Sequence, residues 1–306
     1  MALKVQEPAA LIEELVGAGS QIPSLPAVST RLLEMTRQPI DKINIREIVS
    51  LVETDPGLAA RILRLANSPF FAVKGEIRSL GRAIVQIGLI ETINTAQFYL
   101  FRQSMPNMPD IEGFSDDAFW AHSWACASAA RLLGRPDYHV TALPGELYLA
   151  GLLHGIGKLV LAVHRPEEFA ECLRVASKDQ IPLHEAEREI FGFTDSTLGA
   201  KVLRSWDLPL SIRAAVAAYR APRSVAPGQR EFVALIQFAY IIANKTGIGR
   251  SGSDCEVDLS TTWIVSEGAS ILAQESIQQQ IVAEVQAGLS KKSDYFVGEE
   301  PEPEPE

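Results

Sequence analysis

The sequence predicts an all-α protein, and three observations support this class. Apolar residues recur at helical spacing through most of the chain. Segments that alternate between apolar and polar residues, as half-buried strands do, are nearly absent. Capping residues precede several of the apolar stripes. The 306 residues are 47% hydrophobic and 22% charged, which is typical of a globular chain able to build a core without disulfides.

Short helices are predicted in succession through the N-terminal part of the chain. A turn is expected at residues 23–26, which contain two prolines. Asn44 precedes Glu47 by three residues, the spacing of a capping box at a helix start. The sequence Asn67-Ser68-Pro69 ends a later helix. The apolar stripes are Leu11, Leu15 and Val16; Val28, Leu32, Leu33 and Met35; Leu58, Ile62 and Leu65; and Ala83, Ile84 and Ile87.

The strongest internal break lies at residues 105–110, where two prolines and an asparagine end a helix. We therefore predict an N-terminal helical subdomain at 10–105 and a second helical subdomain at 111–290. Ser115 is expected to cap the next helix, because Asp116 and Asp117 follow it and favour the positive end of a helix dipole. Residues 257–265 are the best strand candidate.

The charge balance is acidic, with 28 basic and 38 acidic residues and a formal net charge of −10. Five of the acids lie in the Pro-Glu sequence at the end, so residues 298–306 are predicted to be a disordered tail. Without these acids the net charge is about −5, an ordinary value. This balance disfavours a generally basic nucleic-acid-binding protein.

We expect a cytoplasmic protein without a membrane span. The N-terminus lacks the apolar stretch of a signal peptide. The longest apolar run, residues 147–163, is interrupted by glycines, a histidine and a lysine, which predicts a buried helix instead. The three cysteines are far apart and offer neither a disulfide framework nor a metal-binding Cys-x-x-Cys pair, which fits a reducing compartment. These cysteines are Cys126, Cys172 and Cys255.

Two histidines are predicted to face inward. His122 has Phe119, Cys126 and small residues one and two helical turns away, which places it on the apolar face. His154 lies beside Gly151 and Gly155, which are one turn apart and favour a close approach of another backbone or of a ligand. An isolated inward histidine is commonly a hydrogen-bonded core residue, and this alternative stays open for both.

The chain resembles the HDOD family, the HD-related output domains of bacterial signalling proteins, over residues 18–250. The strings Gly151-Leu152-Leu153-His154-Gly155-Ile156-Gly157-Lys158 and Trp120-Ala121-His122-Ser123 carry this resemblance. Five other segments match in order, at 22–26, 55–68, 77–84, 87–88 and 206–209. The resemblance implies a bundle in which an N-terminal helical subdomain packs on a subdomain similar to the HD metal phosphohydrolases.

The chain departs from the HD pattern at the metal ligands that the resemblance implies. HD enzymes use a His, a His-Asp pair and a distant Asp, which neutralise a metal ion and leave a position for water. His122 and His154 take the histidine places, but Gly155 takes the place of the adjacent Asp. Three further places differ, since Asp195 and the pair Tyr219-Arg220 stand where relatives often have histidines, and Tyr240 stands near the last Asp place. We expect no metal, no cofactor and no catalytic residue.

The residues at these places suit an anion better than a metal. Arg220 offers paired donors to a phosphate, Lys158 offers a point charge, and Tyr219 can stack or donate a hydrogen bond. We therefore predict a ligand-binding site formed by His122, His154, Lys158, Asp195, Tyr219 and Arg220. The alternative is a former cleft that side chains now fill.

A second candidate surface lies in residues 56–102, which hold six basic and two acidic residues. Arg61 and Arg64 lie off the apolar stripe of their helix and are predicted, with Arg78 and Arg82, to bind an acidic partner. The alternative is an ordinary solvated helix face.

Our leading hypothesis is a non-catalytic signal-transduction module that binds a partner protein or a small anionic or nucleotide ligand, with a shift in population between its two subdomains. The rival hypotheses are a metal-dependent phosphohydrolase or phosphodiesterase with altered ligands and a pure protein-interaction scaffold.

Overall fold

A computed structural model describes residues 7–17, 22, 27–38, 42–71, 75–252, 259–267 and 271–290. These residues form an all-helical structure in which the only β pairing is a single bridge between Ile111 and Phe114. Four features considered above lie outside the described residues. They are the predicted tail at 298–306, the turn at 23–26, Cys255, and Lys74, which is one of the six basic residues of the segment 56–102.

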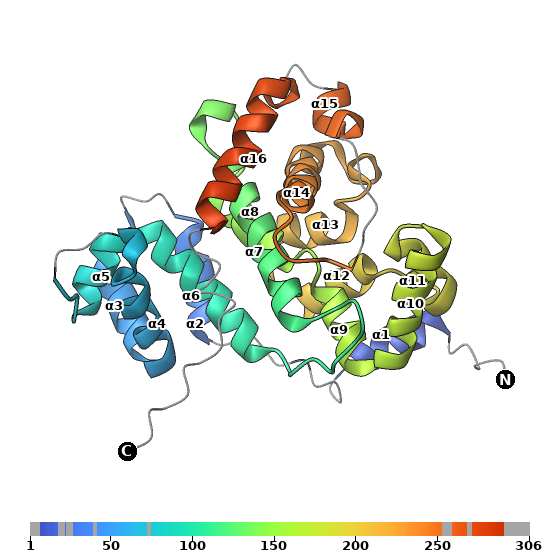
Figure 1. Ribbon diagram of the computed structural model, residues 1–306, viewed down its shortest axis with the longest axis horizontal. Helices are drawn as coiled ribbons and strands as arrows, with labels where there is room; N and C mark the ends of the chain where they lie inside the picture. The colour runs from blue at the N-terminus through green and yellow to red at the C-terminus, as the bar shows by residue number, and fades with distance from the viewer. Residues whose placement is uncertain are drawn as a thin grey trace.

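The helices form two groups that lie side by side (Figure 1). The smaller group contains α2 (Ala27–Thr36), α3 (Ile45–Glu53), α4 (Pro56–Ala66), η2 (Pro69–Phe71), α5 (Leu80–Ile87) and α6 (Leu89–Ser104). The larger group contains α1 (Pro8–Val16), α7 (Asp116–Leu133), η3 (Pro136–Tyr138), α8 (Pro144–Leu153), α9 (Ile156–His164), α10 (Pro166–Asp179), α11 (Leu183–Phe191), α12 (Asp195–Ser205), α13 (Leu210–Ala218), η4 (Pro222–Ser224), α14 (Pro227–Thr246), η5 (Leu259–Thr261), α15 (Trp263–Glu267), η6 (Ile271–Ala273) and α16 (Glu275–Ser290).

Local sequence signals set several of the helix ends. Asn44 caps α3 by accepting a hydrogen bond from the Arg46 N–H at 2.9 Å, and Ser115 caps α7 through the Ala118 N–H. The helix α4 ends at Ala66, directly before the predicted stop. The predicted break also holds, because α6 ends at Ser104 and α7 begins at Asp116. The division of the chain into subdomains at that break stays a prediction.

Each group has its own hydrophobic core, and α6 contributes to both. Ile93, Ala96 and Leu100 of α6 belong to the smaller core. Phe98 and Phe101 of the same helix belong to the larger core, where they pack against Trp120 and Trp206 with ring centroids 5.8 and 6.0 Å apart. The helix α6 therefore joins the two groups through opposite faces.

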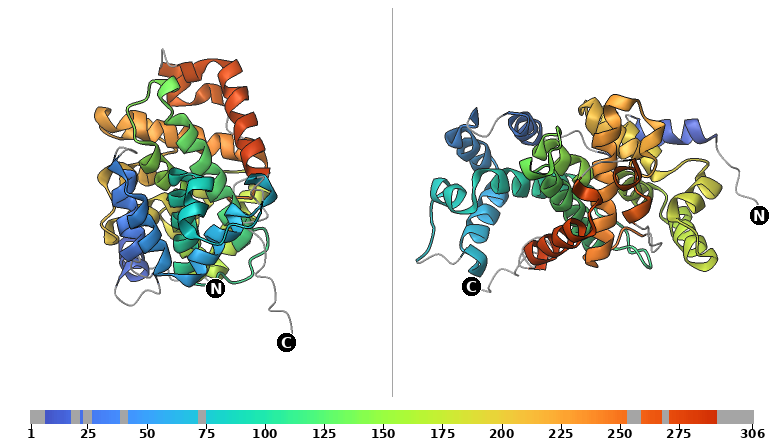
Figure 2. Two further views of the ribbon diagram at one scale, coloured as in Figure 1. Left: turned by 90° about the vertical axis from the view of Figure 1, so that its left-hand side faces the viewer. Right: turned by 90° about the horizontal axis from the view of Figure 1, so that it is seen from above.

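One expectation about local structure needs correction, and the place of α1 is not evident from the sequence. Leu11 and Leu15 of α1 pack in the larger core and α1 contacts α12, at the far end from α2–α5 (Figure 2). The strand predicted at 257–265 is wrong where it is described, because η5 and α15 occupy those residues. Strand propensity is weak and packing overrides it; here the Trp263 N–H donates to the Gln237 side chain of α14 at 3.3 Å.

The apolar run around His154 forms two core helices. The chain bends at Gly155, which separates α8 from α9. Among the described residues, Pro144–His164 is the one stretch that is long and apolar enough to span a membrane, and 89% of its most apolar window is buried inside the fold. This burial confirms the expectation of a core helix at this run.

Candidate functional site

The predicted site residues converge in one buried cluster of the larger group. His122 lies on α7, His154 ends α8, and Lys158 lies on α9. Asp195 begins α12, and Tyr219 ends α13. Arg220 follows Tyr219, and Tyr240 of α14 completes the cluster. Apart from Arg220, whose side chain is 20% exposed, every one of these residues is buried.

Close contacts between helices bring these side chains together. A Cβ atom added to Gly151 of α8 would lie 2.8 Å from the Cα atom of Ala127, so α7 and α8 pack backbone against backbone beside the two histidines. A Cβ atom on Gly157 of α9 would overlap the main-chain oxygen of Asp195, so α9 and α12 are equally close. The close backbone approach expected beside His154 is present at Gly151, whereas Gly155 faces the Phe119 ring and Gly157, which was not predicted, makes the second close contact.

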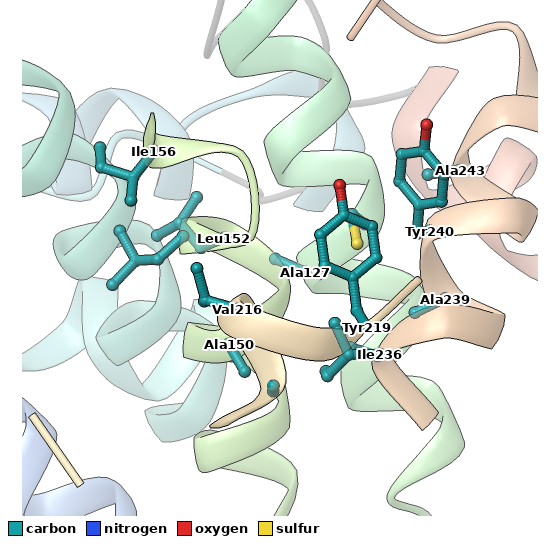
Figure 3. Close-up of a cluster of buried hydrophobic side chains, with 14 of the residues drawn as sticks. Ala127, Ala150, Leu152, Ile156, Val216, Tyr219, Ile236, Ala239, Tyr240 and Ala243 are labelled. Atoms are coloured by element: carbon teal, nitrogen blue, oxygen red, sulfur yellow. The ribbon is translucent and has the colours of Figure 1, made fainter. Parts of the chain in front are cut away.

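Four aromatic rings fill the centre of the cluster. The His122 and His154 rings have centroids 5.4 Å apart, and the Tyr240 ring lies 5.7 and 5.5 Å from them. Tyr219 packs against His154 and Tyr240, at 5.4 and 5.1 Å. In the close-up, the hydroxyl groups of Tyr219 and Tyr240 point in the same direction (Figure 3). The two tyrosines thus occupy the space beside the histidines.

The two histidines are held as neutral imidazoles. Burial lowers the pKa of His154 to about 3, and the Nδ1 of His154 donates a hydrogen bond to the main-chain oxygen of Gly151 at 2.7 Å. That bond leaves the Nε2 of His154 as an acceptor. Burial, together with the nearby His154 and Lys158, lowers the pKa of His122 well below its ordinary value.

Asp195 is committed to an ion pair with Arg220. The Nη1 of Arg220 lies 3.0 Å from the Oδ1 of Asp195, and its Nη2 donates to Oδ2 at 3.3 Å. The same guanidinium donates to Ser196 and lies 4.5 Å above the Tyr219 ring. Burial alone would raise the pKa of Asp195, but Arg220 and Lys158 outweigh it and hold that pKa well below the usual range.

Glu187 of α11 is a member of the cluster that sequence reasoning missed. Its Oε2 accepts a hydrogen bond from the Asp195 N–H at 2.8 Å, and its side chain is fully buried. Burial and the adjacent Asp195 carboxylate raise the pKa of Glu187 well above its ordinary value, so it is held as a neutral acid. The sequence does contain a signal for the burial of Glu187. This residue follows Leu183 by four positions and so lies on an apolar helix face.

Lys158 is fully buried and donates a hydrogen bond to the main-chain oxygen of Ser251 at 2.6 Å. Ser251 belongs to residues 247–252, which follow α14. The same segment is fixed to α7 by the Arg250 N–H, which donates to the main-chain oxygen of Ala118 at 2.9 Å. The segment 247–252 thus covers the cluster from the side of α7 and α9.

The side chains of the cluster do not fit a divalent metal ion. Such a site needs anionic ligands that are free to coordinate, but the Asp195 carboxylate is already paired with Arg220. Gly155 and Tyr240 stand where the resemblance implied carboxylates, and the Lys158 ammonium would repel a cation. In the part of the chain that the structure describes, no three His, Cys, Asp or Glu side chains group in a way that holds a metal.

The four arginines predicted to bind a partner lie on the smaller group. Arg64, Arg78 and Arg82 are exposed, and Arg61 is half-buried with its guanidinium 4.6 Å from the centre of the Tyr99 ring. Arg64 and Arg78 line a surface pocket of 650 Å³. Arg78 is paired with Glu76 at 2.6 Å, which reduces the positive charge of this surface. Arg61 and Arg64 lie on α4, Arg78 precedes α5 and Arg82 lies on α5, all apart from the buried cluster.

The all-helical fold and the paired histidines define a protein of the HD-like class. The family model for the HDOD domain matches residues 22–222, and the chain belongs to the HDOD family. An HDOD domain protein of unknown function from Geobacter sulfurreducens has a similar crystal structure, with a TM-score of 0.75, 22% identity, and coverage of 94% of this chain and 97% of that one.

Other relatives are equally distant in sequence. A Shewanella amazonensis structure provisionally described as a phosphohydrolase has a TM-score of 0.63 and 20% identity, and 97% of each chain is covered. A Marinobacter aquaeolei structure provisionally described as a signal transduction protein has a TM-score of 0.70 and 21% identity, with 96% of this chain and 66% of that one covered. An uncharacterised protein of Treponema pallidum is 23% identical over 190 residues, which are 62% of this chain but only 36% of the relative. At these identities the likeness establishes the fold.

Proposed function

We propose that this protein is a non-catalytic signal-transduction module of the bacterial cytoplasm that acts by binding a partner protein or a small anionic ligand. The ion pair between Asp195 and Arg220 is the observation that carries this proposal. HD-type hydrolysis needs a metal-bound water, and so needs carboxylates that are free to bind metal. In this cluster the one ionised carboxylate is neutralised by a guanidinium instead.

The partner would bind the exposed basic residues of the smaller group. Arg64, Arg78 and Arg82 are exposed in this group, and so is Val85 of α5, an apolar side chain that is 70% exposed. Exposed cationic and apolar groups suit an acidic partner, because charge steers the encounter and apolar contact adds affinity. Because α6 packs in both cores, binding on this side would be transmitted to the larger group as a population shift.

Metal analysis of untagged protein, combined with a phosphodiesterase assay in added Mn²⁺, tests the absence of catalysis. We expect less than stoichiometric iron, manganese and zinc and no hydrolysis of bis-p-nitrophenyl phosphate. Stoichiometric metal with turnover would overturn the proposal and favour the phosphohydrolase alternative.

Charge reversal tests the basic surface. The double variant Arg64→Glu/Arg82→Glu is expected to lose binding to the physiological partner, whereas Arg223→Glu in the larger group should retain it. Equal binding by both variants would show that the partner docks elsewhere.

A further inference from the structure

The Lys158 ammonium is a buried charge whose hydrogen-bond partner, among the described residues, is a neutral carbonyl. Its side chain is fully buried, and the main-chain oxygen of Ser251 accepts this bond. An ammonium has three N–H donors, and burial is costly for it unless a counter-charge is near. Among the described residues no carboxylate forms an ion pair with Lys158.

The other charges of the cluster cancel. Asp195 and Arg220 neutralise each other in their ion pair. Glu187 is held as a neutral acid, and the two histidines are held as neutral bases. Among the described residues, Lys158 is therefore the cation of the cluster that has no ion-pair partner, and an anion would balance its charge.

Three buried polar atoms of the same cluster have no hydrogen-bond partner among the described residues. They belong to three different elements: α7 and the ends of α8 and α13. Hydrogen-bonding capacity of this kind is rarely left unused in a folded protein. The atoms are the Nε2 of His122, the Nε2 of His154 and the Oη of Tyr219.

The segment 247–252 covers Lys158 through main-chain contacts. Gly249 has a φ of +66°, and a Cβ atom there would overlap the Ala118 oxygen and the His122 nitrogen. The segment therefore fits against α7 only with glycine at this position. The oxygen that it places on Lys158 is a neutral carbonyl, which an anionic oxygen can replace with a stronger, charge-assisted bond.

We propose that residues 247–252 are a displaceable cover, and that the Ser251 carbonyl occupies the binding position of a small protonated oxyanion of the inorganic phosphate class. The anion would accept hydrogen bonds from Lys158 and Tyr219 and donate one to the Nε2 of His154. The four rings are in contact, with centroids 5.1 to 5.7 Å apart, and leave no room for a nucleoside, so the anion would take the position that the displaced Ser251 carbonyl leaves. No covalent step is involved.

This inference deepens the proposed function and rests on the absence of catalysis in the cluster. Different experimental results would overturn the proposed function and this inference. Stoichiometric metal with turnover would overturn the proposed function, whereas metal-free protein that ignores phosphate would overturn this inference alone.

Phosphate titration by calorimetry on the full chain tests the site with three variants. Lys158→Met keeps the side-chain length and removes the charge, and is expected to fold and to lose binding. Gly249→Ala dislodges the cover and is expected to lower the apparent Kd for phosphate several-fold, because the open state no longer has to be populated first. Gly228→Ala, where a Cβ atom meets nothing within 4 Å, is the matched control and should bind as wild type.

Hydrogen exchange on the wild-type chain provides a test that does not depend on the variants folding. Phosphate is expected to increase exchange at the Arg250 amide, whose bond to Ala118 holds the cover. Binding of equal strength to wild type and Lys158→Met would show an adventitious ion only and would overturn the proposal. So would unchanged exchange at Arg250, or the absence of binding to both wild type and Gly249→Ala.

Discussion

The Nη1 of Arg220 lies 3.0 Å from the Oδ1 of Asp195, a fully buried carboxylate. Removing one partner of such a pair leaves the other charge buried without compensation. Arg220→Ala is therefore expected to lower the free energy of unfolding by about 3 kcal/mol in urea titration.

Arg223→Ala is the control for this loss. The pair between Arg223 and Glu267 is exposed, with 66% and 42% of the side chains accessible, and its removal should cost less than about 1 kcal/mol. Similar losses in the two variants would contradict the role given to the buried pair.

Acid is expected to destabilise the fold through the buried histidines. Burial lowers the pKa of His154 from 6.5 to about 3, so between these pH values the unfolded chain binds a proton that the folded chain does not. The free energy of unfolding therefore falls as the pH falls, by about 1 kcal/mol per pH unit for this histidine. His154→Gln should show a correspondingly shallower decline in urea titrations between about pH 6 and 4, whereas His139→Asn, at an exposed histidine, should follow wild type.

Glu187→Gln is expected to change the stability of the fold at neutral to alkaline pH. Because the pKa of Glu187 is raised well above its ordinary value, the folded chain keeps a proton that the unfolded chain releases. This costs stability as the pH rises from about 4.5 toward the folded pKa. Glutamine resembles the protonated acid, so the variant should gain stability over wild type at about pH 8 and not at about pH 4 in thermal unfolding. A loss at both values would show that Glu187 is ionised in the fold.

The close contact between α9 and α12 predicts a strong effect at Gly157. A Cβ atom there would overlap the main-chain oxygen of Asp195, which cannot move without shifting the start of α12. Gly157→Ala is expected to lose at least about 2 kcal/mol of stability or to fail to fold. Gly81→Ala, where a Cβ atom meets nothing within 4 Å, should change stability by less than about 1 kcal/mol in the same unfolding assay.

The helical class and many helix ends follow from local sequence. Asn44 and Ser115 cap helices as predicted, because a capping interaction involves only residues two or three positions apart. The region around 257–265 was misread for the opposite reason, since its conformation depends on packing against α14, which no local pattern records.

The candidate site was only partly predictable. Periodicity places His122 and His154 inward, but the convergence of Asp195, Tyr219 and Arg220 on them depends on how α12 and α13 fold back. Only the family resemblance indicated that convergence. The contact between Lys158 and the Ser251 carbonyl was not predicted, because it joins main chain to side chain across 93 positions.

The position of α6 limits how this protein can be dissected. A fragment that begins at residue 111 would lose Phe98 and Phe101, which pack against Trp120 and Trp206. A fragment that ends at residue 105 would present the same two phenylalanines to water. The two groups of helices are therefore expected to fold together, and neither fragment should be stable alone.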